Sequence, residues 1–182
     1  MAQDTESRTG AQRQRSLGWR FGFIGAGALY ARAMSTPSAN SRIERLVEWV
    51  DTDAAGIAHN SAIMRWVEAC ETQLMRDLDL LRYFPATPRV QYTVNFTAQL
   101  KFGQGVEVEL TVKEVGRSSL TFEFSVVGAP FEGRPAAQAA HGTVTTVHVP
   151  LGSTSSAPWP AELRARLADA HWTSLASAPE VA

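Results

Sequence analysis

The chain has 182 residues, enough for one domain with a buried core. Hydrophobic residues make up 45% and charged residues 19% of it, and the formal net charge of -1 excludes nucleic-acid binding through a broad basic face. No apolar run reaches the roughly 18 to 20 residues that span a bilayer. The one cysteine, Cys70, excludes an internal disulfide. The single cysteine and the absence of a cysteine–histidine cluster from the sequence argue against a metal site and for a reducing, cytoplasmic setting.

Residues 1–41 carry basic side chains, a short apolar run from Phe21 to Tyr30 and the small-residue sequence Ala31-Arg32-Ala33. This pattern loosely resembles a secretory signal, but glycines dilute the apolar run and an arginine lies inside the would-be cleavage sequence. We therefore expect a disordered extension, or a start that is set too early, with translation beginning at Met34.

A strand is predicted over residues 42–50, because Ile43, Arg45, Val47 and Trp49 share one face under period-2 alternation. A polar loop follows. A helix is then predicted from about Ser61 to about Leu81, with apolar residues at steps of three or four: Ile63, Val67, Cys70, Leu74, Leu78 and Leu81.

The ends and the outer face of this helix can also be predicted. Asn60 or Ser61 is expected as the N-cap, and prolines at 85 and 88 end the segment. Glu68 and Glu71 are spaced to face two arginines of the same helix, Arg65 and Arg76, so we expect them on a solvated stripe.

After the helix, the period of the apolar residues changes from 3.6 to 2. Seven of them alternate with polar residues from Val90 to Phe102, and three further strands are predicted around residues 106–112, 120–126 and 136–149. A serine-rich linker and a short helix from Pro160 to about His171 close the chain. We therefore expect an α+β domain over residues 42–150, followed by a linker and short helix over 151–182.

The loop and the start of the helix carry a specific motif. It comprises Asp51, Asp53, Gly56, Ile57, His59, Asn60, Arg65, Trp66 and Glu68. The motif resembles the opening of the hotdog-fold acyl-CoA thioesterases of the 4-hydroxybenzoyl-CoA thioesterase type, including their tol-pal-associated relatives. Residues 96–126, with their "GRSS" turn, and the last strand are similar to later parts of that family. Ala54-Ala55 and Ala62-Ile63 depart from its pattern.

The resemblance implies a five-stranded antiparallel sheet wrapped around one long helix. It also implies a homodimer or homotetramer with sites between subunits, and hydrolysis of an acyl-CoA thioester without metal or redox cofactor. Asp53 matches the catalytic carboxylate, as nucleophile or as general base for water. Arg117, Ser118 and Ser119 match residues that hold coenzyme phosphates.

The residues themselves suggest further roles around Asp53. Gly56 permits a close backbone approach, and the backbone N–H of Asn60 or Ser61 at the helix start could polarise the thioester oxygen. His59 is expected to orient the loop or the substrate, and Asp51 to support the loop.

Each role has a structural alternative. Asp53 could simply cap its turn, Asn60 could only cap the helix, and Arg117 could be an exposed turn residue. Two other functions also stay open on the sequence: hydrolysis of acyl-carrier-protein thioesters that releases a fatty or polyketide chain, and non-catalytic acyl binding.

Overall fold

The structure is a computed structural model and describes residues 39–169. The expectations for the N-terminal extension lie outside the described residues. The strands are β1 (Asn40–Leu46), β2 (Arg89–Phe96), β3 (Gly105–Val115), β4 (Ser119–Gly128) and β5 (Ala137–Val147). The α-helices are α1 (Asn60–Asp77) and α2 (Ala161–Asp169), and short 3-10 helices span Trp49–Asp51 and Leu81–Ala86.

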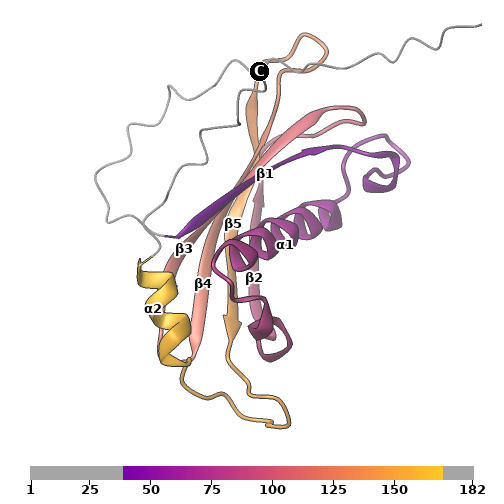
Figure 1. The fold of residues 1–182 in the computed structure, drawn as a ribbon. Coiled ribbons are helices and arrows are strands. Elements are labelled where there is room, and N and C mark those ends of the chain that lie inside the picture. The colour runs from indigo at the N-terminus through magenta and orange to yellow at the C-terminus, as the bar shows by residue number, and fades with distance from the viewer. Residues whose placement is uncertain (1–38, 170–182) are drawn as a thin grey trace, which may run out of the picture. The chain divides into compact units, whose positions relative to one another are not determined.

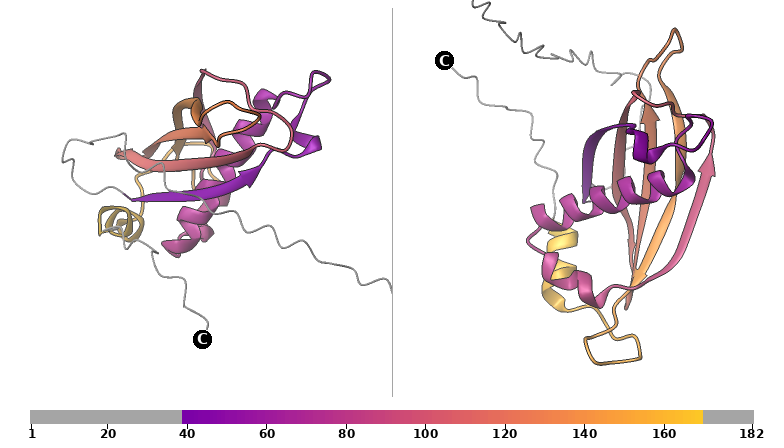
Figure 2. Two further views of the ribbon diagram at one scale, coloured as in Figure 1. Left: turned by 90° about the horizontal axis from the view of Figure 1, so that it is seen from above. Right: turned by 90° about the vertical axis from the view of Figure 1, so that its right-hand side faces the viewer.

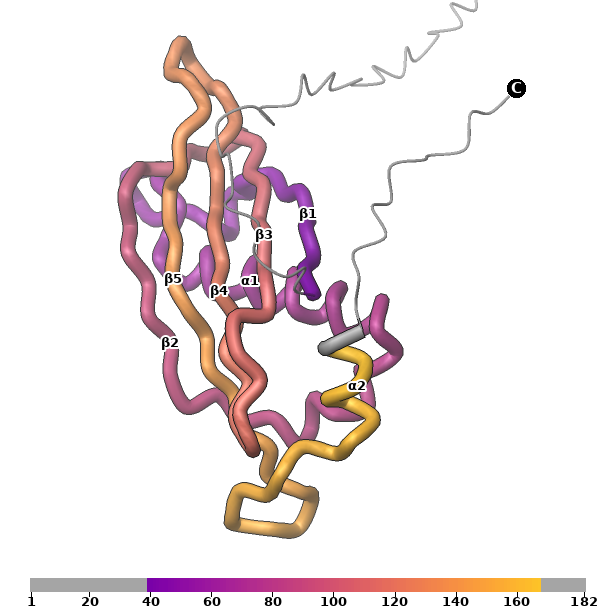
Figure 3. The backbone as a smooth tube through the Cα atoms, turned by 90° about the vertical axis from the view of Figure 1, so that its left-hand side faces the viewer, coloured from indigo at the N-terminus to yellow at the C-terminus, as the bar shows by residue number. Residues whose placement is uncertain are grey.

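The strands form one antiparallel sheet in the order β1-β3-β4-β5-β2, so β1 and β2 are its edges. Figure 3 shows this order across the sheet. The long helix α1 crosses one face, and the sheet curves around it (Figures 1 and 2). The predicted α+β arrangement of five antiparallel strands against one long helix is confirmed.

The core lies between α1 and the central strands. Alternate residues of β3 and β4 are buried, as the period-2 pattern predicted: Val106, Val108, Leu110, Val112, Leu120, Phe122, Phe124 and Val126. From α1 they meet a buried stripe that contains Ile63, Val67, Cys70 and Leu74. On β5, Gly142 lies so close to β2 that an added Cβ would stand 1.8 Å from the carbonyl oxygen of Thr93, so no larger residue fits.

The first strand is shorter than predicted. It ends at Leu46 and is followed by the 3-10 helix Trp49–Asp51, so Trp49 is 74% exposed instead of sharing a face with buried Val47. The chain leaves the sheet here because the Asp51 carboxylate accepts a hydrogen bond from the Glu48 N–H (3.0 Å) and closes the tight turn.

The helix also differs from the prediction at both ends. It begins at Asn60 with His59 as N-cap, where Asn60 or Ser61 was predicted. It ends at Asp77, and the predicted stripe residue Leu81 opens the next 3-10 helix and is 40% exposed. Asp79, with a positive φ of 55°, lies between the two helices and turns the chain.

The prediction that Glu71 lies on a solvated stripe of the helix was wrong. This side chain is buried, 3% exposed, and one of its oxygens lies 2.7 Å from Nη2 of Arg89 on β2. Glu68 is exposed, as predicted, but it also pairs with Arg89 (3.1 Å) and not with an arginine of its own helix.

The long strand predicted to Phe102 was wrong in its second half. β2 ends at Phe96, and the chain then crosses to β3 through an irregular segment. Because β2 is an edge strand, its apolar face is only partly covered: Phe96 is 56% and Val90 58% exposed.

The C-terminal segment packs against the domain. Helix α2 begins at Ala161, one residue after the predicted start at Pro160, and buries Leu163 and Leu167. The predicted end near His171 lies outside the described residues. Arg166 donates a hydrogen bond to the backbone oxygen of Leu78 (2.9 Å), which ties α2 to the end of α1.

Candidate active site

The loop between β1 and α1 is fastened to the chain that enters β3. The Val47 N–H donates to the oxygen of Gln104, and the Gly103 N–H donates to the oxygen of Val47, each at 2.9 Å. Ile57 forms an isolated antiparallel bridge with Lys101. The loop is therefore held on both of its flanks, although it belongs to no regular element.

Asp51 is the anchor inside this loop. It is 5% exposed, and its Oδ1 accepts a hydrogen bond from Nη2 of Arg65 at 2.7 Å. Its Oδ2 accepts from the Glu48 N–H, and its backbone oxygen accepts from the His59 N–H at 2.7 Å. With both carboxylate oxygens bound, Asp51 links the start of the loop to the first turns of α1.

Asp53, in contrast, is exposed, and only one of its carboxylate oxygens is bound. Oδ1 accepts hydrogen bonds from the backbone N–H groups of Ala55 (2.8 Å) and Ile57 (3.3 Å). Oδ2 has no hydrogen-bond or ion-pair partner in the part of the chain that the structure describes. The turn fixes the orientation of the carboxylate and leaves one oxygen free for chemistry.

Gly56 completes the turn around Asp53. Its φ of +70° lies in the left-handed region that favours glycine, and its N–H donates to the oxygen of Asp53 (3.0 Å). An added Cβ would meet nothing within 4 Å, so the space beside Gly56 is open. Glycine is needed for its backbone conformation, and a ligand can approach this backbone closely.

His59 and Ser61 form a small network at the helix start. Nδ1 of His59 accepts a hydrogen bond from the Ser61 N–H (3.2 Å) and lies 2.8 Å from the Ser61 hydroxyl. Arg65 donates to that hydroxyl at 3.0 Å and thus joins Ser61 to Asp51. Since Nδ1 acts as an acceptor, the proton of the neutral imidazole lies on Nε2.

This network decides which N–H of the helix start is free. The Ser61 N–H is engaged by His59, whereas the Asn60 N–H has no acceptor among the described residues. Helix α1 has 18 residues, and its aligned peptide dipoles place roughly half a positive charge at this end. An anionic or polarised oxygen beside the Asn60 N–H would be stabilised.

The predicted coenzyme residues lie far from this loop. Arg117 and Ser118 lie in the turn between β3 and β4, and Ser119 opens β4, whereas the loop packs beside Gly103, before β3 begins. The eleven residues of β3 separate the two places by roughly 35 Å at about 3.3 Å per residue. Figure 3 shows the turn between β3 and β4 at the opposite end of the sheet from the hairpin between β4 and β5. One chain therefore does not bring all predicted site residues together.

The β3–β4 turn is fixed by the C-terminal segment. The backbone oxygen of Arg117 accepts from the Trp159 N–H (2.9 Å), and that of Ser118 accepts from the His148 N–H (2.8 Å). The His148 ring stacks on Trp159 at 5.1 Å. Sequence reasoning missed these contacts, because the hydrogen-bonded residues lie 30 and 42 positions apart in the chain and no local pattern joins them.

The described residues contain no group of three or more His, Cys, Asp or Glu side chains that could hold a metal ion. Cys70 is fully buried, and its Sγ lies within hydrogen-bond distance of the Ser41 oxygen (3.3 Å). Burial raises the pKa of this thiol to about 11, so Cys70 is a packed core residue and not a nucleophile. None of the helices within residues 39–169 combines the length and the apolar character of a membrane-spanning segment.

The model of the thioesterase-like superfamily matches residues 47–167, more than half of the chain. The chain belongs to this superfamily. The match confirms the family predicted from the loop motif and, with it, the class of enzyme: a thioester hydrolase. A comparison with curated protein sequences gives no match.

Solved structures show the same fold. A 1,4-dihydroxy-2-naphthoyl-CoA thioesterase from Synechocystis has a TM-score of 0.63 at 20% identity, over 71% of this chain and 96% of that one. A thioesterase from Thermus thermophilus, complexed with coenzyme A and zinc, has a TM-score of 0.60 at 24% identity, over 70% and 91%.

A mutant of 4-hydroxybenzoyl-CoA thioesterase, complexed with 4-hydroxybenzoyl-CoA, has a TM-score of 0.60 at 18% identity, over 71% and 99%. At these identities the likeness shows the fold alone. This superfamily member therefore has the hotdog fold, as predicted.

Proposed function

We propose that the protein hydrolyses an acyl-CoA thioester to a free carboxylic acid and coenzyme A, with Asp53 as the catalytic carboxylate. The observation that carries the proposal is the half-bound state of Asp53, whose Oδ1 is fixed by two N–H groups while Oδ2 is open on an exposed loop. Relatives crystallised with coenzyme A and with an aroyl-CoA support coenzyme A as the thiol part.

The open oxygen of Asp53 can act in two ways. As nucleophile, it attacks the thioester carbon and the carbon–sulfur bond breaks, giving a mixed anhydride and a thiolate that takes a proton. Water then cleaves the anhydride and restores the carboxylate. As general base, Asp53 takes a proton from a water molecule that attacks the same carbon. Carboxylate and water supply all the chemistry, so neither route uses a metal or redox cofactor.

The carbonyl oxygen becomes negative in both routes. We assign its stabilisation to the Asn60 N–H and the positive end of the α1 dipole, because the Ser61 N–H is already engaged. Such a donor contributes about 3 kcal/mol to the transition state. The side chains of His59 and Ser61 then act as positioning groups that hold the helix start, and Gly56 leaves room for the thioester.

The test of this function is a thiol-release assay with a panel of acyl-CoA thioesters, aromatic and aliphatic, each paired with the same acyl group on an acyl-carrier protein. We expect turnover of at least one acyl-CoA, with a kcat/KM above that of its carrier-protein partner. Faster turnover of the carrier-protein thioesters would favour the alternative substrate class. Acyl-CoA binding without thiol release would favour a non-catalytic acyl-binding protein.

We further propose that the enzyme is a cytoplasmic homodimer or homotetramer whose site is completed by a second subunit. In one chain the predicted coenzyme residues Arg117, Ser118 and Ser119 lie a sheet length from Asp53. A coenzyme whose phosphates are held by this turn would therefore place its thioester at the Asp53 of another subunit. The exposed apolar side chains Val90 and Phe96 of the edge strand β2 support such an association.

Mixing two inactive variants tests the shared site. Asp53→Asn and Arg117→Ala are each expected to lose activity, but a refolded equal mixture should regain roughly a quarter of the wild-type rate, because half of the dimers carry one intact site of two. The readout is thiol release, with light scattering to verify the dimer. Activity of the mixture equal to the mean of the two variants, or a monomer, would contradict the shared site.

A further inference from the structure

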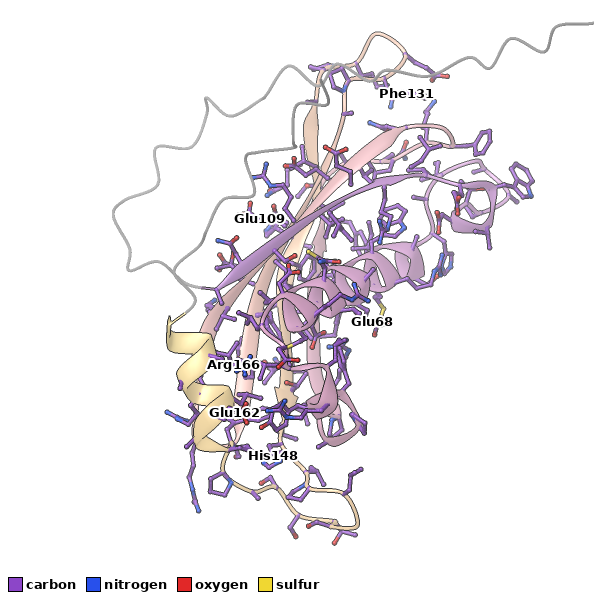
Figure 4. The ribbon with its side chains drawn as sticks, viewed as in Figure 1. Glu68, Glu109, Phe131, His148, Glu162 and Arg166 are labelled. Carbon is purple, nitrogen blue, oxygen red and sulfur yellow. The ribbon has the colours of Figure 1, made fainter. Side chains whose placement is uncertain are left out.

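A cavity lies behind the catalytic loop and is not used by the proposed reaction. It has a volume of about 280 Å³ and is formed by the connection from β2 to β3 and the hairpin between β4 and β5. Its walls are mainly apolar, with Leu100 and Phe131 among the larger side chains. Figure 4 shows Phe131 at the tip of that hairpin. The volume suits a small organic molecule of about ten non-hydrogen atoms.

The two walls of the cavity are fastened together by Gln104, which is 8% exposed. Its Oε1 accepts a hydrogen bond from the Lys101 N–H (3.1 Å), and its Nε2 donates to the oxygen of Ala129 on the opposite wall (2.7 Å). At the hairpin tip, Phe131 and Arg134 exchange two backbone hydrogen bonds (3.0 and 2.9 Å). The cavity is therefore built from braced backbone on both sides.

The charges around the cavity are predominantly positive. Lys101 and Arg134 supply two cations, and Glu132 supplies the one carboxylate of the lining. Glu132 stands 3.6 Å from Lys101 and is 61% exposed, so this pair is weak. Arg134 forms no ion pair within residues 39–169. An apolar cavity with one uncompensated cation fits a small monocarboxylate, its apolar body inside and its carboxylate toward Lys101 and Arg134.

The cavity wall is also hydrogen-bonded to the loop that carries Asp53. The Ala58 N–H donates to the oxygen of Leu100 (2.8 Å), and the Phe102 N–H donates to the oxygen of Gly56 (3.3 Å). Between these two hydrogen bonds, Lys101 and Ile57 form the isolated antiparallel β-bridge. A molecule that presses on Leu100 and Lys101 therefore acts on the same backbone that positions the Asp53 turn.

We propose that this cavity is a second site that binds a small apolar carboxylic acid, the product class of the thioesterase reaction, and that its occupation slows turnover by shifting the Asp53 loop. The identity of the ligand as product rests on the proposed function. The site itself rests on the cavity, its two cations and its backbone connection to the loop.

The experiment measures binding of benzoate and hexanoate to the full chain by calorimetry, with the neutral benzamide as control. We expect benzoate to bind at least tenfold more tightly than benzamide. The double variant Lys101→Met/Arg134→Met should bind benzoate at least tenfold more weakly. Glu132→Gln should bind benzoate about threefold more tightly, because it frees Lys101 from its ion pair. Arg42→Met, which removes an exposed cation on β1, is the matched control.

Two results would overturn the second site: equal affinity for benzoate and benzamide, or benzoate binding that is the same in the wild type and the double variant. Asp53→Asn should keep the binding, which shows that the acid is not held in the catalytic loop. The kinetic readout is inhibition of thiol release by benzoate that an excess of acyl-CoA does not relieve. If no acyl-CoA is hydrolysed while benzoate still binds through the two cations, the proposed function fails and the second site stands.

Discussion

Replacing Asp53 by asparagine is expected to lower kcat for the best acyl-CoA substrate by about 10²- to 10⁴-fold. The substitution removes the charge and the nucleophilic or basic oxygen. It keeps the amide oxygen, which can still accept the hydrogen bonds from Ala55 and Ile57 that shape the turn. The loss should therefore appear in kcat at saturating substrate, with KM changed little. Thiol release under single-turnover and steady-state conditions measures it.

Asp77→Asn is the matched control for this experiment. Asp77 is exposed at the end of α1, and its Oδ1 accepts a hydrogen bond from Gln73 (2.7 Å) that asparagine can also accept. This variant should hydrolyse the substrate at the wild-type rate. Retention of more than a third of kcat by the Asp53 variant, with an unchanged melting temperature, would remove Asp53 from the chemistry and leave it as a turn residue.

A labelling experiment separates the two roles of Asp53. During a single turnover in ¹⁸O-water, a general base directs the label only into the acid product. A nucleophile forms the mixed anhydride, and attack of water on its aspartyl carbonyl leaves the label in the enzyme. A mass increase of the peptide that contains Asp53 therefore identifies the nucleophilic route.

The parts of the fold that the sequence predicted correctly depend on neighbours along the chain. The alternation in β3 and β4 matches the observed burial because these strands lie inside the sheet and turn one face toward the core, which also holds residues of α1 and α2. The same alternation continued past Phe96, but the edge strand does not, because there the chain crosses to β3. Of the apolar residues predicted in this segment, Leu100 is buried in the core and Phe102 is 53% exposed.

The candidate site shows the same division. Asp51, Asp53 and Gly56 lie within six residues, so their motif and the geometry of their turn could be predicted together. The bridge from Arg65 to Asp51 spans fourteen residues and joins a helix to a loop, which no period along the chain reveals. In the proposed shared site, the relation between Asp53 and Arg117 depends on a second subunit, which no local pattern of one sequence encodes.

Glu71 shows why a helical charge pattern can mislead. Its spacing from arginines of the same helix predicted a solvated side chain, but its partner is Arg89, eighteen residues later and on β2. The Arg89 guanidinium contacts both Glu71 (2.7 Å) and Glu68 (3.1 Å). It thus joins the edge strand to the middle of α1. The buried hydroxyl of Tyr92 lies nearby and has no hydrogen-bond partner within the described chain.

Arg89→Met is expected to reduce the free energy of unfolding by about 3 to 5 kcal/mol at pH 7, because it leaves the Glu71 carboxylate buried without its counter-charge. The pH dependence has a definite sign. Burial raises the pKa of Glu71 above 4.5, and the positive charge of Arg89 opposes this rise. Without Arg89, the Glu71 carboxyl therefore binds a proton more tightly in the folded protein than in the unfolded chain. The variant should therefore lose stability as the pH rises above 4.5, more steeply than the wild type. Urea unfolding at about pH 5 and about pH 7 measures this difference.

Two further variants identify the cause of that loss. Adding Glu71→Gln to Arg89→Met removes the buried charge, so the double variant should recover most of the stability at pH 7 and lose the steep pH dependence. Arg42→Met removes an exposed arginine that pairs with Glu107 at 3.1 Å, and it should cost less than about 1 kcal/mol at either pH. If Arg89→Met were as harmless as Arg42→Met, or equally harmful at both pH values, the destabilisation would not come from the buried carboxylate. The helix and the edge strand would then be held together by apolar packing alone.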